Sequence, residues 1–363
     1  MKIDPASLAS HRQLMASGIS PGIFPYLGGS ISTGQLRSVV MSCGGAVVSG
    51  KQGAKLAKEM PGILVDPAAY APQGKSEPEG LFDYDDWLMR QQAADVPVIL
   101  TDTPRIPNKD RSALHKALAR WDWLDKPALV VLPIESWWLR HGLAWLTEEV
   151  RAAGRPVAIV LLHQFNGLDH AGAVAGLLTF IAAVAPLPVV LLRCDISAIG
   201  AVAHGAFAGF VGWATSGRHG PLPIRPAEDN DQRDESPSVL VPALNGYLKA
   251  SKLPALRNRP LDVLRCDDPV CHGESLLRIA ERSEVNIRDG RMLACRHNLA
   301  STEQLAGRIL ADAEPRDAWW EACNAGAKMS ASLAEGGVSL PVPRWLRQWL
   351  ELGSPSHHYQ DAG

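Results

Sequence analysis

The alternation of short β-rich runs with helical patterns is the feature that most constrains the fold of this chain. Stretches between the runs, such as 110–124, place apolar residues three and four positions apart, as an amphipathic helix requires. Repeated strand-then-helix units predict a parallel sheet covered by helices. The β-rich runs are GILVD (62–66), VPVILTD (96–102), PALVVLP (127–133), PVAIVLL (156–162), PVVLLRCD (188–195) and FAGFVGWAT (207–215).

Two further segments bring the number of expected strands to about eight. We expect an N-terminal strand near LRSVVMSC (36–43) and a last strand at LDVLRC (261–266). Eight strands that alternate with helices are typical of a (β/α)8 TIM barrel, and a doubly wound open sheet is the alternative. The polar stretch 225–238 has the composition of a surface insertion or mobile loop.

The charge and cysteine content of the chain indicate its cellular compartment more than they indicate its ligand. The 36 basic and 38 acidic residues give a net charge of −2, so a nucleic-acid contact would have to be a local patch. Six unevenly spaced cysteines and an N-terminal stretch unlike a signal peptide predict a reducing, cytoplasmic setting. The most apolar run, 173–194, contains Pro186 and Pro188 and predicts a helix followed by a strand. We therefore expect no transmembrane segment and no membrane partner.

A group of potential metal ligands lies in LRCDDPVCHG (264–273) and CRHN (295–298). Zinc takes about four soft or borderline ligands, and a tight turn followed by a helix can supply them. The same spacing also allows isolated buried thiols, because C-x4-C is looser than C-x2-C. The candidate ligands are Cys266, Asp268, Cys271 and His297, with Cys295 as a rival for the fourth position and His272 as a weaker one.

This pattern resembles the zinc motif of the tRNA-guanine transglycosylase superfamily. In that motif, C-x-C-x-x-C is followed 26 residues later by a histidine, usually in His-Asn-Leu, and here CDDPVC (266–271) is followed at the same distance by HNL (297–299). DPVC (268–271) also echoes the Cys-Pro-Val-Cys of the archaeosine-type branch. Asp268 replaces the middle cysteine and is a harder ligand. The resemblance implies a structural Zn2+ that ties a subdomain onto the barrel.

The sequence thus suggests a (β/α)8 TIM barrel with a C-terminal zinc-binding subdomain. We assign residues 1–262 to the barrel, 263–352 to the zinc-binding subdomain and C-terminal helices, and 353–363 to a disordered tail.

The family exchanges guanine in nucleic acid for a 7-deazaguanine base through a covalent enzyme–ribose intermediate. Two carboxylates carry such chemistry: one attacks the anomeric carbon and the other manages protons on the bases. VDPAAY (65–70) resembles the family's Asp-Ser-Gly-Ala-Tyr, which makes Asp66 the match for the acid/base. The other reading of Asp66 is a cap for the following turn.

Two more barrel residues match family positions that contact the base. TDTPRIP (101–107) resembles Asp-Ile-Pro-Thr, whose Asp bonds the base, and this points to Asp102. LPIES (132–136) falls where the family has Pro-Val-Gln-Gly, so Glu135 takes the Gln position.

The family's nucleophile has no counterpart in this chain. AVAHGAFAGFVGWATSGRHG (201–220) resembles the run that leads into the nucleophilic Asp, yet no Asp or Glu occurs between Asp195 and Glu228, and Phe210, Val211 or Gly212 stands at the expected place. Asp195, at the end of the preceding strand, is the nearest substitute, and its other expected role is to cap a helix near Ser197.

The loop TSGRHG (215–220) resembles the family's Pro-Thr-Arg segment. It makes Arg218 and His219 candidate nucleic-acid contacts, with an ordinary solvated loop as the alternative.

Three functions follow as expectations. The first is a cytoplasmic, zinc-containing transglycosylase that exchanges guanine for a 7-deazaguanine base in tRNA or DNA. The second is a catalytically silent paralogue that binds nucleic acid or partners an active transglycosylase subunit as a homo- or hetero-dimer. The third, an unrelated barrel hydrolase that uses Asp66 and Asp102, is disfavoured by the HNL spacing.

Overall fold

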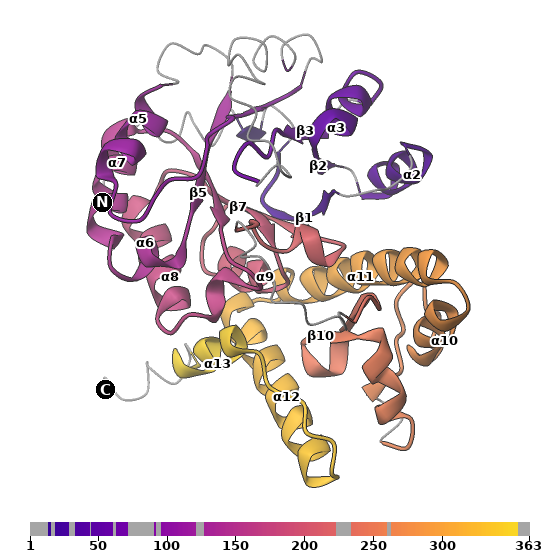
Figure 1. Ribbon diagram of the computed structural model, residues 1–363. Coiled ribbons are helices and arrows are strands. Elements are labelled where there is room, and N and C mark those ends of the chain that lie inside the picture. Colours follow the sequence, from indigo (N-terminus) through magenta and orange to yellow (C-terminus); the bar gives the residue numbers. More distant parts are fainter. Residues whose placement is uncertain are drawn as a thin grey trace, which may run out of the picture. The chain divides into compact units, whose positions relative to one another are not determined.

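The computed structural model of the chain contains two compact units (Figure 1). The first comprises Met1–Gly212 and Ser216–Pro223, and the second comprises Trp213–Thr215 and Ile224–Gly363. The structure describes residues 14–15, 19–28, 33–43, 45–60, 63–71, 91, 96–120, 127–222, 234–259 and 263–354. Most of the predicted mobile loop (225–233) and most of the predicted tail (355–363) lie outside the described residues, and the suggested domain boundary at residue 262 stays a prediction.

Eight parallel strands of the first unit form a nearly closed barrel, which confirms the predicted (β/α)8 fold. Their order is β3-β2-β1-β8-β7-β6-β5-β4, and the two outermost strands, β3 and β4, contact each other. The first and last strands pair in parallel from Gly22 with Ala208 to Tyr26 with Gly212. The strands are β1 (Gly22–Leu27), β2 (Ala46–Ser49), β3 (Ile63–Asp66), β4 (Ile99–Leu100), β5 (Ala128–Ile134), β6 (Val157–Leu161), β7 (Val189–Cys194) and β8 (Ala208–Gly212).

Two of the predicted strands are wrong. Residues 36–43 belong to helix α2 (Thr33–Cys43), because their buried residues, Leu36 and Val40, are four apart and so lie on one helical face. In the segment predicted as the last strand, residues 263–266 form no strand, and Arg265 makes only an isolated bridge with Ser275. The barrel instead obtains its first two strands from β1 and β2.

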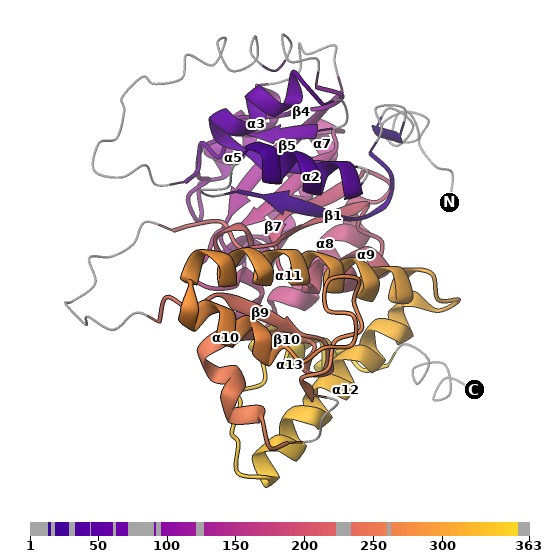
Figure 2. The same cartoon turned by 90° about the vertical axis from the view of Figure 1, so that its right-hand side faces the viewer.

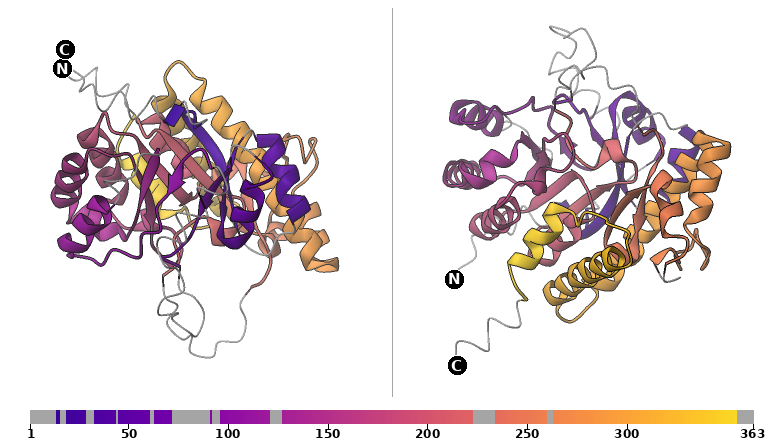
Figure 3. Two further views of the ribbon diagram at one scale, coloured as in Figure 1. Left: turned by 90° about the horizontal axis from the view of Figure 1, so that it is seen from above. Right: turned by 60° about the horizontal axis from the view of Figure 1, so that its bottom comes forward.

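Helices cover the outside of the barrel, and α5, α7 and α8 lie side by side there (Figure 3). Local signals set their ends: Asp110 caps α5 by accepting from the Ala113 amide, and Gly154 ends α7 at a φ of +62°. Strand β7 follows α8 as predicted, and among the described residues no helix is long and apolar enough to cross a membrane. The helices are α2, α3 (Gly50–Ala57), α5 (Arg111–Ala119), α6 (Ser136–Arg140), α7 (Leu143–Ala153), α8 (Ala173–Val184) and α9 (Ser197–Ala203), with 3-10 turns η1 (Gly167–Asp169) and η2 (Thr215–Gly217).

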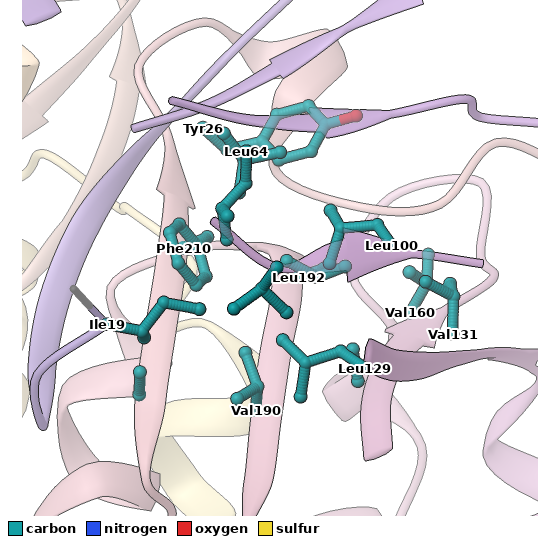
Figure 4. Packing of buried hydrophobic residues seen from close by; sticks show 14 of the residues in the cluster. Ile19, Tyr26, Leu64, Leu100, Leu129, Val131, Val160, Val190, Leu192 and Phe210 are labelled. Atoms are coloured by element: carbon teal, nitrogen blue, oxygen red, sulfur yellow. The ribbon is translucent and has the colours of Figure 1, made fainter. Parts of the chain in front are cut away.

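Alternate residues of the strands fill the interior of the barrel (Figure 4). Because side chains along a strand point alternately to its two faces, every second residue can reach the barrel axis. The interior is therefore a packed core rather than a channel, and any binding site must lie at a rim. The interior residues include Tyr26, Leu64, Leu100, Leu129, Val131, Val160, Val190, Leu192 and Phe210.

The second unit has a hydrophobic core of its own. Strands β9 (Ser238–Val241) and β10 (Gly246–Lys249) form an antiparallel hairpin, and α11 (Ile287–Leu310) packs against β9 and α10 (Leu277–Val285) (Figure 2). Helix α12 (Pro315–Glu335) packs against α13 (Arg344–Glu351). Two 3-10 helices, η3 (Pro242–Leu244) and η4 (Ala250–Leu256), complete the described elements of this unit. Cys266 and Cys271 belong to its core.

Candidate metal centre and the carboxylates of the barrel

Four side chains that can bind a metal meet in the second unit. They are Cys266, Asp268, Cys271 and His297, and one ligand atom from each lies within 4.8 Å of the others. Cys266 is 2% exposed and the other three are fully buried. The cluster could hold a metal ion, and it contains the four ligands expected from the sequence. Cys295, the rival ligand, lies half-buried on α11 and is not a member of it.

A tight turn brings the first three ligands together. Asp268 Oδ1 accepts hydrogen bonds from the amides of Val270 (2.8 Å) and Cys271 (2.7 Å), which closes an Asx-type turn. The Gly273 amide then donates to the carbonyl of Cys266 at 2.9 Å. The turn therefore places the thiols of Cys266 and Cys271 on the same side, toward α11.

Hydrogen bonds orient the remaining ligand atoms. His297 Nε2 lies 2.7 Å from the Leu240 carbonyl and donates to it, so Nδ1 is the nitrogen that faces the cluster. Nδ1 lies 2.7 Å from Asp268 Oδ2 and 3.2 Å from Cys271 Sγ. Ser301 Oγ donates to Asp268 Oδ2 at 2.6 Å. Such outer contacts fix the geometry of a metal site before a metal enters it.

The electrostatics of the cluster favour the anionic forms of Asp268 and Cys266 but not that of Cys271, whose pKa is raised by its hydrogen bond with Cys266 and by burial. Burial alone would raise the pKa of Asp268, but hydrogen bonds from His297, Ser301 and Cys266 hold this pKa well below its usual value. Hydrogen bonds from Cys271, His297 and Ser301 lower the pKa of the Cys266 thiol. Deprotonated thiolates and carboxylates are the forms that bind metal.

Two residues that support the centre were not assigned a role from the sequence. Asn298, the middle residue of HNL, is 1% exposed; it accepts from the Leu240 amide at 2.7 Å and donates to the carbonyls of Trp213 (3.0 Å) and Ser238 (2.9 Å). Ser301 lies four residues after His297, which is the helical spacing that places both side chains on one face. That spacing is the signal that could have identified Ser301.

In the barrel, Asp66 is enclosed by its neighbours. It is the last residue of β3 and is fully buried. Its Oδ2 accepts from the hydroxyls of Tyr26 (2.6 Å) and Tyr70 (2.5 Å), and its Oδ1 accepts from the Ala68 amide (2.8 Å). Burial, reinforced by the charge of Asp66, raises the pKa of both tyrosines, which therefore remain protonated donors.

The guanidinium of Arg193 supplies the positive charge beside this group. It lies 5.4 Å from the ring centre of Tyr26 and 5.7 Å from that of Tyr70. Its Nη2 donates to the Ser216 carbonyl at 2.6 Å. Arg193 has a φ of +50°, a conformation that costs a non-glycine residue about 1 kcal/mol or more. In the Tyr26–Tyr70–Asp66–Arg193 network, two tyrosines thus lie between a buried carboxylate and a partly buried guanidinium.

Asp195 follows β7 and is also bound internally. It is 6% exposed, and it accepts from the amide and hydroxyl of Ser197 and from Asn166 Nδ2 at 2.6 Å. Ser197 is the first residue of α9, so these bonds resemble those of an N-cap, although Ile196 lies between Asp195 and the helix. Burial raises the pKa of Asp195 to about 6. The adjoining cavity, of about 20 Å3, has room for about one water molecule.

Strand β8 has no room for the missing nucleophile at its end. A Cβ atom added to Gly212 would lie 2.2 Å from the carbonyl carbon of Gly217 and 2.6 Å from the Arg218 nitrogen. Phe210 is 2% exposed and its ring stacks on Phe24 at 5.5 Å. The close approach of the loop to Gly212 leaves space only for glycine.

The two carboxylates predicted to bind the base, Asp102 and Glu135, differ from each other in their surroundings. Asp102 is 3% exposed, and within the described part of the chain its Oδ1 has no hydrogen-bond partner. Burial raises the pKa of Asp102 to about 6, although the charge of Arg120 opposes this rise. Glu135 pairs with Arg105 and accepts from Asn108 Nδ2 at 3.1 Å. Asp66 ends β3 and Asp102 follows β4, so both lie at the rim where these parallel strands end, and a pocket shared by the two stays a prediction.

Arg218 and His219, the candidate nucleic-acid contacts, are less exposed to solvent than residues of an ordinary solvated loop would be. Arg218 is 6% exposed, and its Nε donates to the Gly212 carbonyl at 3.0 Å. His219 is half-buried, and burial lowers its pKa.

No protein-family model and no curated protein sequence matches this chain. The resemblance to transglycosylases therefore stands on the motifs themselves.

Proposed function

We propose that this protein is a zinc-stabilised, transglycosylase-like barrel that binds a guanine base in nucleic acid without exchanging it. The observation that carries the proposal is the enclosure of Asp66. An acid/base must be able to reach the proton it transfers, and both oxygens of Asp66 already accept hydrogen bonds from buried donors. The chain then acts as a silent paralogue in the cytoplasm, where it binds tRNA or DNA alone or beside an active subunit.

The absence of space on β8 supports the same conclusion. Covalent exchange needs a carboxylate within reach of the sugar, and close contacts with Gly217 and Arg218 exclude any side chain at Gly212. Asp195, which follows β7, is the other candidate carboxylate, and both of its oxygens already accept hydrogen bonds, one from Ser197 and one from Asn166.

We assign the binding of the guanine base to Asp102. Among the described residues, Asp102 Oδ1 has no hydrogen-bond partner, and such a buried oxygen is costly unless a ligand supplies the donor. A carboxylate can accept from both the ring N–H and the exocyclic amine of guanine, which is the role that the resemblance gives to Asp102. A 7-deazaguanine base presents the same edge and is a second ligand for this position.

We assign zinc to the buried cluster of the second unit, in a structural role. Two sulfurs, one nitrogen and one carboxylate oxygen form a donor set that zinc accepts in tetrahedral geometry. Since the four ligands are at most 2% exposed, a bound ion has no open position for substrate.

Exchange itself is the second candidate function. It is favoured by one observation, a small cavity beside Asp195 that Arg193 and Arg218 also line. In this case Asp195 is the nucleophile, and Asp195→Ala abolishes any covalent adduct with nucleic acid while zinc content stays intact.

Binding of guanine-containing oligonucleotides tests the proposed function. By fluorescence anisotropy at fixed salt, wild type is expected to bind an RNA or DNA strand with guanine at least tenfold more tightly than the same strand with inosine, which lacks the exocyclic amine. Asp102→Asn is expected to remove this preference, because an amide nitrogen then faces the base donors. Glu148→Gln, which removes a 65% exposed carboxylate on α7, is the control and should preserve it. Equal binding of both strands by wild type would contradict the proposal.

A further inference from the structure

A cavity of about 210 Å3 lies in the first unit, between the segment that follows β4 and one face of α5. Residues 103–106 form one wall. The other wall consists of Ala113, Lys116, Ala117 and Arg120, whose spacing of three and four places them on one side of the helix. The cavity is large enough for a group of several heavy atoms.

Positive charge dominates the walls of this cavity. Arg105, Lys116 and Arg120 all line it, and none of the described residues that line it is acidic. Lys116 and Arg120 are four residues apart on α5, where like charges repel each other. Their position near the C-terminus of α5 also suits the helix dipole, so a control with basic residues at the ends of other helices separates a ligand site from a helix-end effect.

Two carboxylates face these cations without lining the cavity. Glu135 pairs with one nitrogen of Arg105, whose guanidinium keeps further donors, and also accepts from Asn108. Asp102 interacts electrostatically with Arg120, but Oδ1 of Asp102 has no hydrogen-bond partner among the described residues. Among the described residues, these three cations and two carboxylates give the region a net positive charge.

We propose that this cavity binds a phosphate group that is part of a larger organic molecule. Arginine binds phosphate oxygens through two parallel hydrogen bonds and lysine adds a point charge. Pro104, Ile106, Ala113 and Ala117 supply apolar wall for the carbon atoms attached to the phosphate. The phosphate belongs either to a free nucleotide or to a nucleic-acid backbone. The inference does not depend on the base-binding function, because the cavity can bind phosphate whether or not Asp102 binds guanine.

Calorimetric titration with inorganic phosphate and with guanosine 5′-monophosphate tests the site. The Lys116→Gln/Arg120→Gln variant is expected to bind both at least tenfold more weakly than wild type, and the monophosphate is expected to bind more tightly than phosphate alone. The control, Arg140→Gln/Arg151→Gln, removes two exposed charges from α6 and α7 and should bind as wild type does. Lys116→Gln alone, at an exposed position, covers the case in which the double variant does not fold.

An oligonucleotide arm identifies the source of the phosphate. If the phosphate belongs to a single-stranded backbone, the double variant makes the slope of log K against log salt shallower by about 0.7, which is the contribution of one phosphate contact. If it belongs to a free nucleotide, the slope stays unchanged while monophosphate binding falls. Wild type that binds neither phosphate nor monophosphate, or a control pair that weakens binding as much as the cavity pair, would overturn the proposal.

Discussion

Cys271→Ala is expected to remove the metal and to destabilise the second unit, whereas wild type carries one zinc per chain. The three remaining ligands are too few for a closed structural site. Because Cys271 is 0% exposed, a water molecule cannot replace its thiol as the fourth ligand. A ligand present at roughly 1,000 times its Kd stabilises a fold by about 4 kcal/mol, and the variant loses this contribution. Metal analysis of purified protein and thermal unfolding with and without chelator measure both effects.

Two further variants sharpen this prediction. Cys295→Ala is the matched control, because this thiol lies only two residues from His297 and outside the cluster, and it should keep the full zinc content. Ser301→Ala keeps all four ligands but removes the bond to Asp268, so zinc affinity should fall about 10- to 100-fold. Wild type without stoichiometric zinc, or full retention by Cys271→Ala, would show that the centre is misassigned.

Asp66→Asn is expected to destabilise the barrel by about 1–3 kcal/mol, because it removes the negative charge beside the partly buried Arg193 and weakens a buried hydrogen-bond network. It also removes an acceptor shared by Tyr26 and Tyr70. Chemical denaturation measures the change in the free energy of unfolding. Glu148→Gln breaks only a partly exposed pair with Arg111 and should cost less than about 1 kcal/mol.

A second substitution separates a structural Asp66 from a catalytic one. In the double variant Asp66→Asn/Arg193→Gln, no partly buried charge remains unpaired, so it should recover part of the stability lost in Asp66→Asn. If Asp66→Asn is as stable as wild type, Asp66 does not hold the network together, and its assignment as an acid/base regains support.

The barrel could be predicted because its strands are encoded locally. Each of the six β-rich runs between residues 62 and 215 overlaps an observed strand, since a strand buried on both faces reads as a continuous apolar run. Strand β1 was missed because Pro25 lies inside it and proline normally marks an edge or an end. Apolar content alone predicts a strand at residues 36–43, whereas the spacing of the apolar residues there is that of a helix.

The metal centre was equally accessible to sequence reasoning. Its ligands come from one turn and one helix, so their spacing in the chain carries most of the geometry. The enclosure of Asp66 was not accessible, because Tyr26 lies 40 residues earlier and meets Asp66 only through the pairing of three strands. The lack of space at Gly212 could not be predicted from the sequence either, because the close approach of Gly217 depends on the path of the loop.

We propose that this barrel binds nucleic acid without exchanging its guanine. The most direct measurement is denaturing electrophoresis of the protein after incubation with guanine-containing RNA and DNA strands, with exchange of labelled guanine followed in parallel. We predict that wild type gives no covalent adduct and no exchange above the level of Asp195→Ala, under conditions in which anisotropy shows the strand to be bound. A covalent adduct of wild type with either strand, accompanied by guanine exchange, would contradict the account.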